Sequence, residues 1–478
     1  MKELKNQLYI NGEWRPASDG GTFQVLDPAT EKVITNVASG TVDDAMLCLK
    51  AAEYAFPLWA SKSPRERGEI LRKAFELITE KLEMIANLIT LENGKGASDA
   101  IGEARYAAEF FRWYAEEAVR SEGHLGMAPS TGARVLVHQK PAGISVLVTP
   151  WNYPAAMGAR KIGPALAAGC PVIIKPASET PLTMLALMPI LEKAGVPPGV
   201  VNVLPSRSSG SVVGAILRDR RTKVVSFTGS TEVGRQILHA AADNVIKPAM
   251  ELGGNAPFIV CEDANLEAAA DGLMVAKMRN LGEACTAANR IYVHENVELE
   301  FVERFIKKMA KLKMGNGSDA SIDVGPLVNA ETRDKVDYFV RDAVSKGAKI
   351  NLGGKKPEGK GFFYPPTVLT NVPDSADCLS DEIFGPVAAI QTFNSEMEII
   401  ERANNTEYGL VAYVYTTDLK RGMNISENLE FGMIGLNRGL VSDPAAPFGG
   451  VKQSGLGREG SKEGMLEFQE TQYISTEW

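Results

Sequence analysis

Cys285 is the residue of this chain whose type and surroundings best suit covalent chemistry. It lies in RNLGEACTAANR, in a break with Gly and Asn between a helix-length segment and the strand-like RIYVHE. A cysteine on such a break can be exposed and held near helix-end dipoles, which favour its thiolate. Most cysteines are small buried hydrophobic residues, and we assign that role to the other four, Cys48, Cys170, Cys261 and Cys378. Cys285 is therefore the candidate nucleophile.

Glu251 is the only carboxylate in the apolar and glycine-rich segment MELGGN, which resembles the end of a strand. Burial there would raise the pKa of the carboxyl group towards that of a general base. A salt-bridged residue at a sheet edge would show the same pattern. The two interpretations are about equally supported by spacing alone, so Glu251 is a candidate base.

Two glycines, Gly229 and Gly234, flank a turn in TGSTEVG, where the strand-like VVSF meets a helical segment. A helix N-terminus attracts phosphate through its free N–H groups and its dipole. The pattern is not GxGxxG, and an ordinary strand-to-helix turn would also produce it. In isolation, the turn is therefore only a weak indication of dinucleotide binding.

Lys175 ends the strand-like PVII, where it either holds ribose hydroxyls or faces solvent. An acidic residue near the ribose would accept a bond from the 2′-hydroxyl and repel a 2′-phosphate. Three residues after Lys175 stands Ser178, which is small and neutral, with Glu179 beside it. We therefore expect NADP to be accepted and preferred to NAD, unless Glu179 turns into the ribose site.

Two arginines flank the residues considered for chemistry. Arg160 lies eight residues after Asn152 on what the pattern predicts to be one helix, and Arg279 lies six residues before Cys285. A lone arginine near a pocket mouth is usually part of a surface ion pair. Two arginines placed in this way favour a clamp for a substrate carboxylate, because guanidinium binds carboxylate bidentately.

The candidate residues lie in a part of the chain where apolar strand-like segments alternate with amphipathic helix-like segments. This alternation begins at about residue 144. ISVLVT, PVIIK, VVNVLP, KVVSFTG and KPAMELGG read as strands, separated by helix-length segments. The pattern predicts βαβ units and a doubly wound parallel sheet, in which ligands bind beyond the carboxyl ends of the strands. A second α/β series starts at APFIVCE (256–262) and runs to about residue 435.

Most of the chain before residue 120 reads as amphipathic helix, for example SPRERGEILRKAFELITEKLEMIANLIT. ARVLVHQK (133–140) and the terminal QETQYIST alternate like exposed strands with nothing local to pair with. Such strands suggest an arm that joins another subunit.

The 478 residues suit two or three domains of ordinary globular composition. A net charge of −8 leaves no basic surface for nucleic acid or for an anionic membrane. The sequence has no apolar run long enough to span a bilayer and no secretory signal pattern. Five scattered cysteines and four scattered histidines form no disulfide framework and no metal motif. We expect a cytoplasmic protein with reduced thiols and no metal.

Seven segments then identify a resemblance: TPWNYP, KPASETP, SFTGSTEVG, ELGGN, GEACTAANR, EIFGPV and PFGGVKQSGLGREG. They occur in the order found in the aldehyde dehydrogenase superfamily, and the resemblance covers nearly the whole chain. It implies a doubly wound Rossmann-like cofactor domain, a second α/β catalytic domain and a small β oligomerisation arm.

In this sequence the resemblance places a dinucleotide-binding domain at 1–118 and 140–251 and a catalytic domain at 252–435. It places the arm at 119–139 and 460–478, and a substrate-funnel and bridging segment at 436–459. The arm implies a homodimer or a homotetramer.

By the same resemblance Cys285 is the nucleophile and Glu251 the general base for deacylation. The side chain of Asn152 and the backbone N–H of Cys285 form the oxyanion hole. The resemblance implies a further set of residues that bind the nicotinamide dinucleotide, which are Trp151, Lys175, Ser178, Glu179, Gly229, Ser230, Gly234, Leu252, Glu382 and Phe384.

Within that set, Lys175 would bind the adenosine ribose, and Gly229 and Ser230 would lie near the pyrophosphate. Glu382 and Phe384 would hold the nicotinamide ribose. The implied reaction is the oxidation of an aldehyde to a carboxylic acid through a cysteine thioester.

The chain is most similar to the succinate-semialdehyde dehydrogenase branch, whose members carry residues matching Arg160, Arg279 and Ser442. This implies a small acidic aldehyde as substrate. Glutarate semialdehyde and sulfolactaldehyde are alternatives, and a non-catalytic structural protein of the same fold is a further one.

The chain departs from that branch at three positions. Ala287 replaces a second cysteine, Glu283 replaces a glutamine near the nucleophile, and Arg438 replaces a smaller or acidic residue of the funnel.

Overall fold

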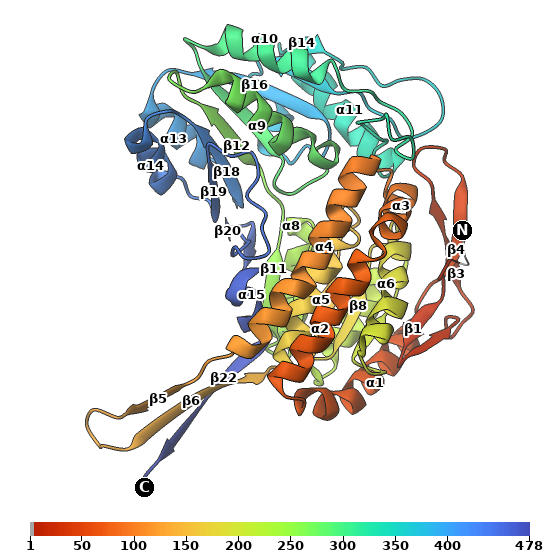
Figure 1. Cartoon of the computed structure of the whole chain (residues 1–478). Helices are drawn as coiled ribbons and strands as arrows, with labels where there is room; N and C mark the ends of the chain where they lie inside the picture. Colours follow the sequence, from red (N-terminus) through yellow and green to blue (C-terminus); the bar gives the residue numbers. More distant parts are fainter. Residues whose placement is uncertain (1–3) are drawn as a thin grey trace.

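Two twisted and mostly parallel sheets form the body of the protein, and a narrow three-stranded sheet projects from one end (Figure 1). This architecture is seen in a computed structural model that describes residues 4–478. The α/β fold class predicted from the alternation of segments is confirmed. None of the helices within residues 4–478 combines the length and the apolar character that crossing a bilayer requires.

The first sheet has eight strands, and its five central strands run parallel. Their order is β2 (Glu13–Arg15), β1 (Leu8–Ile10), β9 (Val201–Val203), β8 (Val172–Lys175), β7 (Ile144–Val148), β10 (Thr222–Thr228), β11 (Lys247–Glu251) and β21 (Gly455–Leu456). The chain moves outward from β7 in both directions, so the carboxyl ends of β7 and β10 flank a topological switch point. Ligands of such sheets bind at this point.

Helices cover both faces of this sheet, because successive strand residues point to opposite sides and both sides are apolar. One face packs on α1 (Val42–Ala60), α7 (Ser209–Arg218) and α8 (Thr231–Ala242). The other packs on α5 (Ala156–Ala168) and α6 (Pro181–Ala194), with α2 (Pro64–Thr79), α3 (Leu82–Asn93) and α4 (Ala97–Glu117) outside them.

The second sheet has seven strands, of which only the edge strand β14 is antiparallel. Their order is β14 (Lys349–Leu352), β15 (Thr367–Thr370), β16 (Val387–Phe393), β13 (Ala288–His294), β12 (Ala256–Val260), β18 (Val411–Tyr415) and β19 (Met433–Leu436). One face packs on α9 (Leu266–Met278) and α10 (Glu298–Met309). The other packs on α11 (Ala330–Ser345), α12 (Asp377–Ser380), α13 (Glu396–Asn404) and α14 (Leu419–Asn428).

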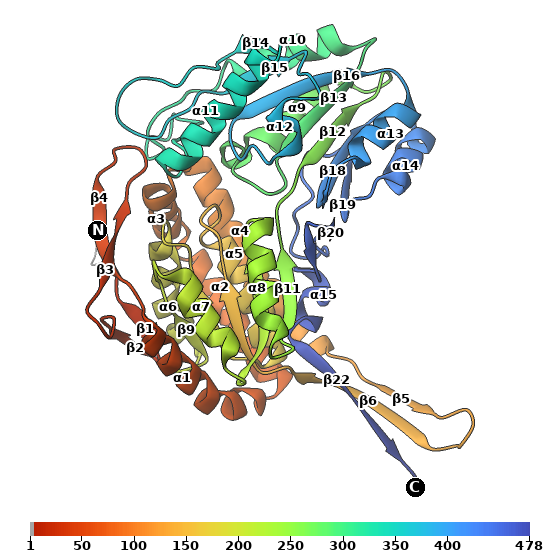
Figure 2. The same cartoon turned by 180° about the vertical axis from the view of Figure 1, so that it is seen from behind.

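The projecting arm consists of β5 (His124–Met127), β6 (Arg134–Pro141) and β22 (Gln469–Thr476), as Figure 2 also shows. β6, which was expected to have nothing local to pair with, forms a hairpin with β5, and it also pairs along its whole length with β22. β22 returns to the arm from the far end of the chain. Helix α15 (Ser461–Leu466) packs on α4 and α5, so the segment 460–466 belongs to the body and not to the arm.

The segment 436–459 joins the two sheets. It pairs β20 (Val451–Lys452) with β17 (Tyr408–Gly409), and then adds β21 to the edge of the first sheet beside β11. The sequence did not predict the N-terminal strands β1 and β2, nor the hairpin of β3 (Thr22–Leu26) and β4 (Val33–Ala38). The long helix predicted for 63–90 is two helices, α2 and α3.

Candidate active site

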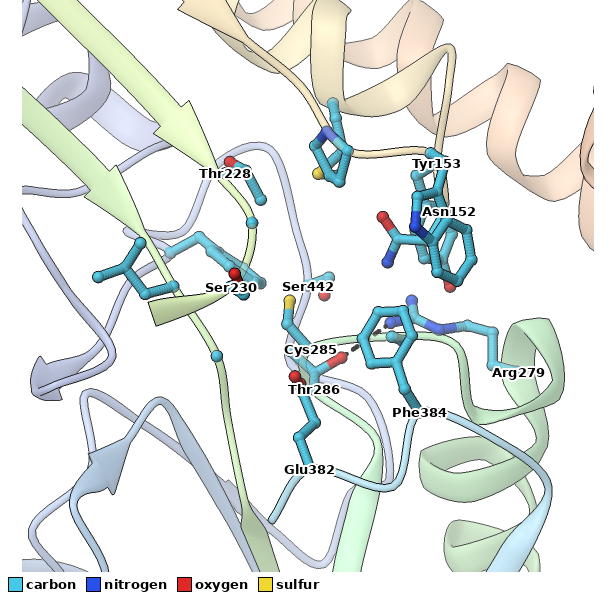
Figure 3. Close-up of a pocket in the computed structure, with 18 of the residues that line it drawn as sticks. Asn152, Tyr153, Thr228, Ser230, Arg279, Cys285, Thr286, Glu382, Phe384 and Ser442 are labelled. Carbon is cyan, nitrogen blue, oxygen red and sulfur yellow. Dashed lines mark hydrogen bonds between the residues drawn. The ribbon is translucent and has the colours of Figure 1, made fainter. Parts of the chain in front are cut away.

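A pocket of about 240 Å³ lies between the two sheets, beyond the carboxyl ends of β7 and β10. Most of the residues predicted for the site line it, as Figure 3 shows for part of the set. These residues are Trp151, Asn152, Arg160, Gly229, Ser230, Leu252, Arg279, Cys285, Glu382, Phe384 and Ser442. Glu251, Lys175, Ser178, Glu179 and Gly234 are not among the residues of the pocket wall.

Cys285 lies on a turn between α9 and β13, as its surrounding sequence indicated. A short 3₁₀ segment, Arg279–Gly282, precedes it, and three successive residues of that segment have positive φ. Asn280 (φ 50°) tolerates this conformation, but Leu281 (φ 55°) is strained by its side chain. Burial raises the pKa of the Cys285 thiol to about 12, and the charge of Arg160 opposes this rise. Burial thus favours the neutral thiol over the thiolate.

Asn152 lies in the loop between β7 and α5, which begins only at Ala156. The prediction that Asn152 shares a helix with Arg160 was wrong. Its side-chain Nδ2 donates to the backbone oxygen of Glu283 at 2.9 Å, which fixes the orientation of the amide. The Asn152 amide and the Cys285 thiol enter the same pocket from different segments (Figure 3).

Glu251 ends strand β11 and is 3% exposed. Burial raises the pKa of its carboxyl group well above the ordinary value, and the nearby negative charge of Glu459 raises it further. The next two residues, Leu252 and Gly253, line the pocket, while the Glu251 carboxyl group lies beside Gly449 outside the wall. The Glu251 carboxyl group is therefore not part of the pocket wall that contains Cys285.

Behind the pocket wall lies a buried cluster of charges that the sequence did not reveal. Glu459 forms ion pairs with both Arg160 and Lys161, and all three side chains are almost completely buried. The ring of Phe448 lies 4.2 Å from the Arg160 guanidinium carbon. Glu459 belongs to the motif PFGGVKQSGLGREG, but nothing in the sequence indicates which buried cations it meets.

Arg279 is placed differently from Arg160. It forms no ion pair with any acidic residue within 4–478, and its guanidinium donates to Thr286 Oγ1 at 3.2 Å. Ser442 lines the same pocket (Figure 3).

Tyr106 was missed by sequence reasoning. It lines the pocket, and its buried hydroxyl has no hydrogen-bond partner among the described residues. The amphipathic pattern of helix α4 does not indicate which of its tyrosines faces the pocket.

The pocket wall also has groups suited to a dinucleotide. Ser230 caps the N-terminus of α8, and the backbone of Gly229 precedes it. Glu382 accepts a hydrogen bond from the N–H of Gly254 at 3.3 Å, and burial raises the pKa of this carboxyl group to about 7. Phe384 has a left-handed backbone (φ 55°).

The ring of Phe384 packs edge-on against Trp151, with centroids 5.3 Å apart. This places two aromatic rings together at the pocket wall.

Four residues predicted for the cofactor lie outside this pocket. Lys175 is buried at the end of β8, where desolvation lowers the pKa of its ammonium group to about 8. Ser178 and Glu179 follow it on the connection to α6, and Glu179 favours the charged form of Lys175. A Cβ at Gly234 would lie 2.4 Å from Leu252 Cδ2, so packing alone accounts for this glycine.

Comparison with known proteins agrees with this arrangement. Residues 14–474 match the aldehyde dehydrogenase family. The chain is 50% identical to a succinate-semialdehyde dehydrogenase of Paenarthrobacter nicotinovorans, over 92% of this chain and 98% of that protein. It is 45% identical to a glutarate-semialdehyde dehydrogenase of Pseudomonas putida, over 98% of both chains.

A crystal structure of an NADP-dependent enzyme of E. coli superimposes with a TM-score of 0.97 at 43% identity, over 99% of this chain and 98% of the other. Both the sequence and the arrangement of the two sheets are thus shared with these relatives. This chain belongs to the aldehyde dehydrogenase family.

Proposed function

We propose that the protein oxidises a small acidic aldehyde, succinate semialdehyde, to the carboxylic acid through a thioester on Cys285. The main support for an acidic substrate is the guanidinium of Arg279. It lines the pocket and has no acidic partner within residues 4–478. A partly buried cation of this kind favours a ligand that brings the opposite charge. Ser442 adds a hydroxyl to the same wall.

The residues present fit a nicotinamide dinucleotide. A helix N-terminus capped by Ser230 suits a pyrophosphate, and the Glu382 carboxylate suits ribose hydroxyls. A Cβ at Gly253 would approach the Tyr408 ring to 3.0 Å, so the wall is narrow here and depends on a glycine. When bound, the dinucleotide supplies the acceptor for the hydride that leaves the tetrahedral carbon.

The first chemical step belongs to Cys285 and Asn152. The Cys285 thiol gives its proton to solvent water, the resulting thiolate adds to the aldehyde carbon, and the carbonyl oxygen becomes an oxyanion. The Asn152 amide and the Cys285 N–H stabilise this oxyanion, which is the largest electrostatic contribution in acyl-transfer sites. When the C=O double bond forms again, the carbon loses hydride and remains bound to sulfur as a thioester.

The second step belongs to Glu251. Its raised pKa suits a carboxylate that takes a proton from water, and the resulting hydroxide adds to the thioester carbon. The carbon–sulfur bond then breaks, and the acid leaves as the Cys285 thiolate is restored.

The preferred cofactor in this proposal is NADP, with NAD as the second choice. Ser178 leaves room for a 2′-phosphate, and Lys175 supplies a nearby positive charge. The E. coli relative described above is NADP-dependent by name, which supports the same preference.

The protein is further proposed to work as a homodimer or homotetramer. The arm carries exposed apolar side chains, among them Leu125, Met127 and Ile474, that a second subunit would cover. Light scattering on the purified protein tests this, and a monomer at micromolar concentration would contradict it.

A panel of aldehydes tests the proposed activity. We expect kcat/KM to be highest for succinate semialdehyde among acidic aldehydes of three to six carbons, and lower for uncharged butyraldehyde. The assay follows reduced cofactor by absorbance with NAD and NADP in turn. Glutarate semialdehyde is the second candidate, because a relative of similar identity carries that name. A higher kcat/KM for butyraldehyde than for any acidic aldehyde would overturn the proposal.

A further inference from the structure

Lys95 and Glu103 form an ion pair that is completely removed from solvent. Lys95 lies between α3 and α4, and Glu103 lies on the second turn of α4. Removing two charges from water is costly, and a buried ion pair is often no more stabilising than apolar residues of similar volume. The pair is therefore poorly explained by stability alone, and its other contacts indicate what it does.

Both members of the pair bind the loop that carries Asn152. Lys95 Nζ donates to the backbone oxygen of Asn152 at 2.9 Å. Glu103 Oε1 accepts from the N–H groups of Ala155 and Ala156 at 2.8 and 3.2 Å, where α5 begins. One ion pair thus holds the loop at its catalytic residue and at the helix N-terminus that follows.

The loop of Cys285 is joined to the same backbone oxygen. Asn280 Nδ2 donates to the oxygens of Asn152 and Glu283, each at 3.0 Å. The N–H of Asn280 donates to Asp99 on the first turn of α4 at 2.7 Å. Lys95 and Asn280 therefore meet at one carbonyl, between the segment of Asn152 and the segment of Cys285.

The loop around Lys95 also touches the second α/β unit directly. The N–H of Ala97 donates to the backbone oxygen of Gly317 at 3.1 Å. A Cβ at Gly325 would lie only 1.9 Å from the oxygen of Gly94, so the two backbones are in close contact. Lys95 thus lies where the two α/β units meet, and it contacts the backbone of Asn152.

We propose that the Lys95–Glu103 pair is a positioning device that holds the Asn152 amide in register with Cys285. Lys95 itself touches neither substrate nor cofactor in this proposal, and it acts through Asn152. A shift of about 1 Å in an oxyanion donor is enough to cost roughly a hundredfold in rate. The inference rests on the proposed role of Asn152 in the reaction.

The test is a double-mutant cycle between Lys95 and Asn152, measured as the rate of the first turnover. Asn152→Ala should slow this step by about 100-fold or more. Lys95→Met should slow it by at least about tenfold, with the affinity for cofactor unchanged in a fluorescence titration. In the Asn152→Ala background, Lys95→Met should cost less than about twofold further, since the two act through one group. Any aldehyde that the enzyme oxidises serves, so the result does not depend on substrate preference.

Two further variants keep the test decisive. Glu103→Gln retains acceptors for Ala155 and Ala156, and it enters the same cycle if Lys95→Met does not fold. Arg67→Met is the matched control, because Arg67 is also a buried cation that donates to a backbone oxygen (Ala167, 3.0 Å) but lies outside the pocket. It should lower the melting temperature and leave the rate of the first turnover unchanged.

Additive losses in the double variant would overturn the positioning role while leaving the proposed function intact. An undiminished first turnover in Lys95→Met would overturn it in the same way. If Asn152→Ala alone had no effect, the proposed oxyanion hole and this inference would both fail.

Discussion

Arg160 and Glu459 form an ion pair inside the protein, beside the pocket that contains Cys285. Arg160 thus already has a carboxylate partner inside the protein, which it shares with Lys161. Arg279 faces the same pocket with no acidic partner among residues 4–478. Of the two arginines predicted to clamp a carboxylate, Arg279 is therefore the one whose charge is left for a ligand.

Arg279→Ala should lower kcat/KM for succinate semialdehyde by roughly 10- to 150-fold, because a hydrogen bond to a charged group contributes ~1.5–3 kcal/mol. Oxidation of butyraldehyde, which has the same chain length without the charge, should be nearly unchanged. Steady-state kinetics with both aldehydes measures the difference. Equal losses for the two substrates would mean that Arg279 only supports its helix, and would reopen the question of the substrate.

Glu251→Gln should separate the two chemical steps. The variant still forms the thioester, so we expect a burst of about one reduced cofactor per site, followed by slow turnover. Rapid-mixing absorbance measures the burst and the steady rate in one experiment. Cys285→Ala is the control and should show neither. Undiminished steady turnover in Glu251→Gln would rule out Glu251 as the base.

The sequence predicted the parallel strands of the first sheet well, because each is a short apolar run between turns. β7, β8 and β11 lie within the predicted segments, β10 begins one residue before its segment, and Cys285 lies on the predicted break. Strands β1 and β2 were not predicted, since each is only three residues long, and the pairing that joins this hairpin to the sheet, β1 with β9, links residues far apart in the chain. Local patterns carry little information about such pairing.

The prediction of the site from the sequence has the same limit. A resemblance to known enzymes brought Asn152, Arg279 and Cys285 together, and the structure places all three in one pocket. It did not reveal that Glu459 pairs with Arg160, because a pairing across 299 positions of the chain leaves no local signal. Buried electrostatics depends on which side chains the fold brings together, and a local sequence pattern does not contain that information.

Ser178→Glu should shift the cofactor preference from NADP towards NAD. A carboxylate at this position repels a 2′-phosphate and accepts a hydrogen bond from a 2′-hydroxyl. The ratio of kcat/KM for the two cofactors measures the shift, and Ser178→Gln, which adds a similar volume without charge, is the control. If the unmodified enzyme used NAD alone, the argument from Ser178 would be wrong.

Glu283→Gln should change how stability depends on pH. Burial raises the pKa of the Glu283 carboxyl group to about 8, while its Oε1 accepts a hydrogen bond from Val328 N–H at 3.1 Å. The folded state therefore binds this proton more tightly than the unfolded state does. The contribution of this proton to the free energy of unfolding is fully present below the ordinary pKa of Glu, 4.5. It is lost as the pH rises to about 8.

Glutamine keeps the acceptor oxygen and does not titrate. The melting temperature of Glu283→Gln should thus exceed that of the unmodified protein by an amount that grows between pH 5 and pH 8 and then levels off. Thermal unfolding at several pH values measures this. A constant difference over the whole range would show that Glu283 has the same pKa in both states.

Tyr106→Phe should weaken recognition of the acidic end of the substrate. The Tyr106 hydroxyl is buried at the pocket without a partner in the described part of the chain, and burial raises the pKa of its phenol, so it remains a donor. A bond from this hydroxyl to a carboxylate contributes ~1.5–3 kcal/mol, so kcat/KM for succinate semialdehyde should fall roughly tenfold or more.

The same helix supplies the control for that experiment. Tyr114 lies two turns further along α4, and its buried hydroxyl also lacks a partner within residues 4–478, but it does not line the pocket. Tyr114→Phe should therefore leave kcat/KM unchanged for both succinate semialdehyde and butyraldehyde. Tyr106→Phe should leave kcat/KM unchanged for butyraldehyde and lower it for succinate semialdehyde, because butyraldehyde has no carboxylate to accept the hydrogen bond. Losses of similar size in the two variants, or for the two substrates, would show that the Tyr106 hydroxyl supports packing and not recognition.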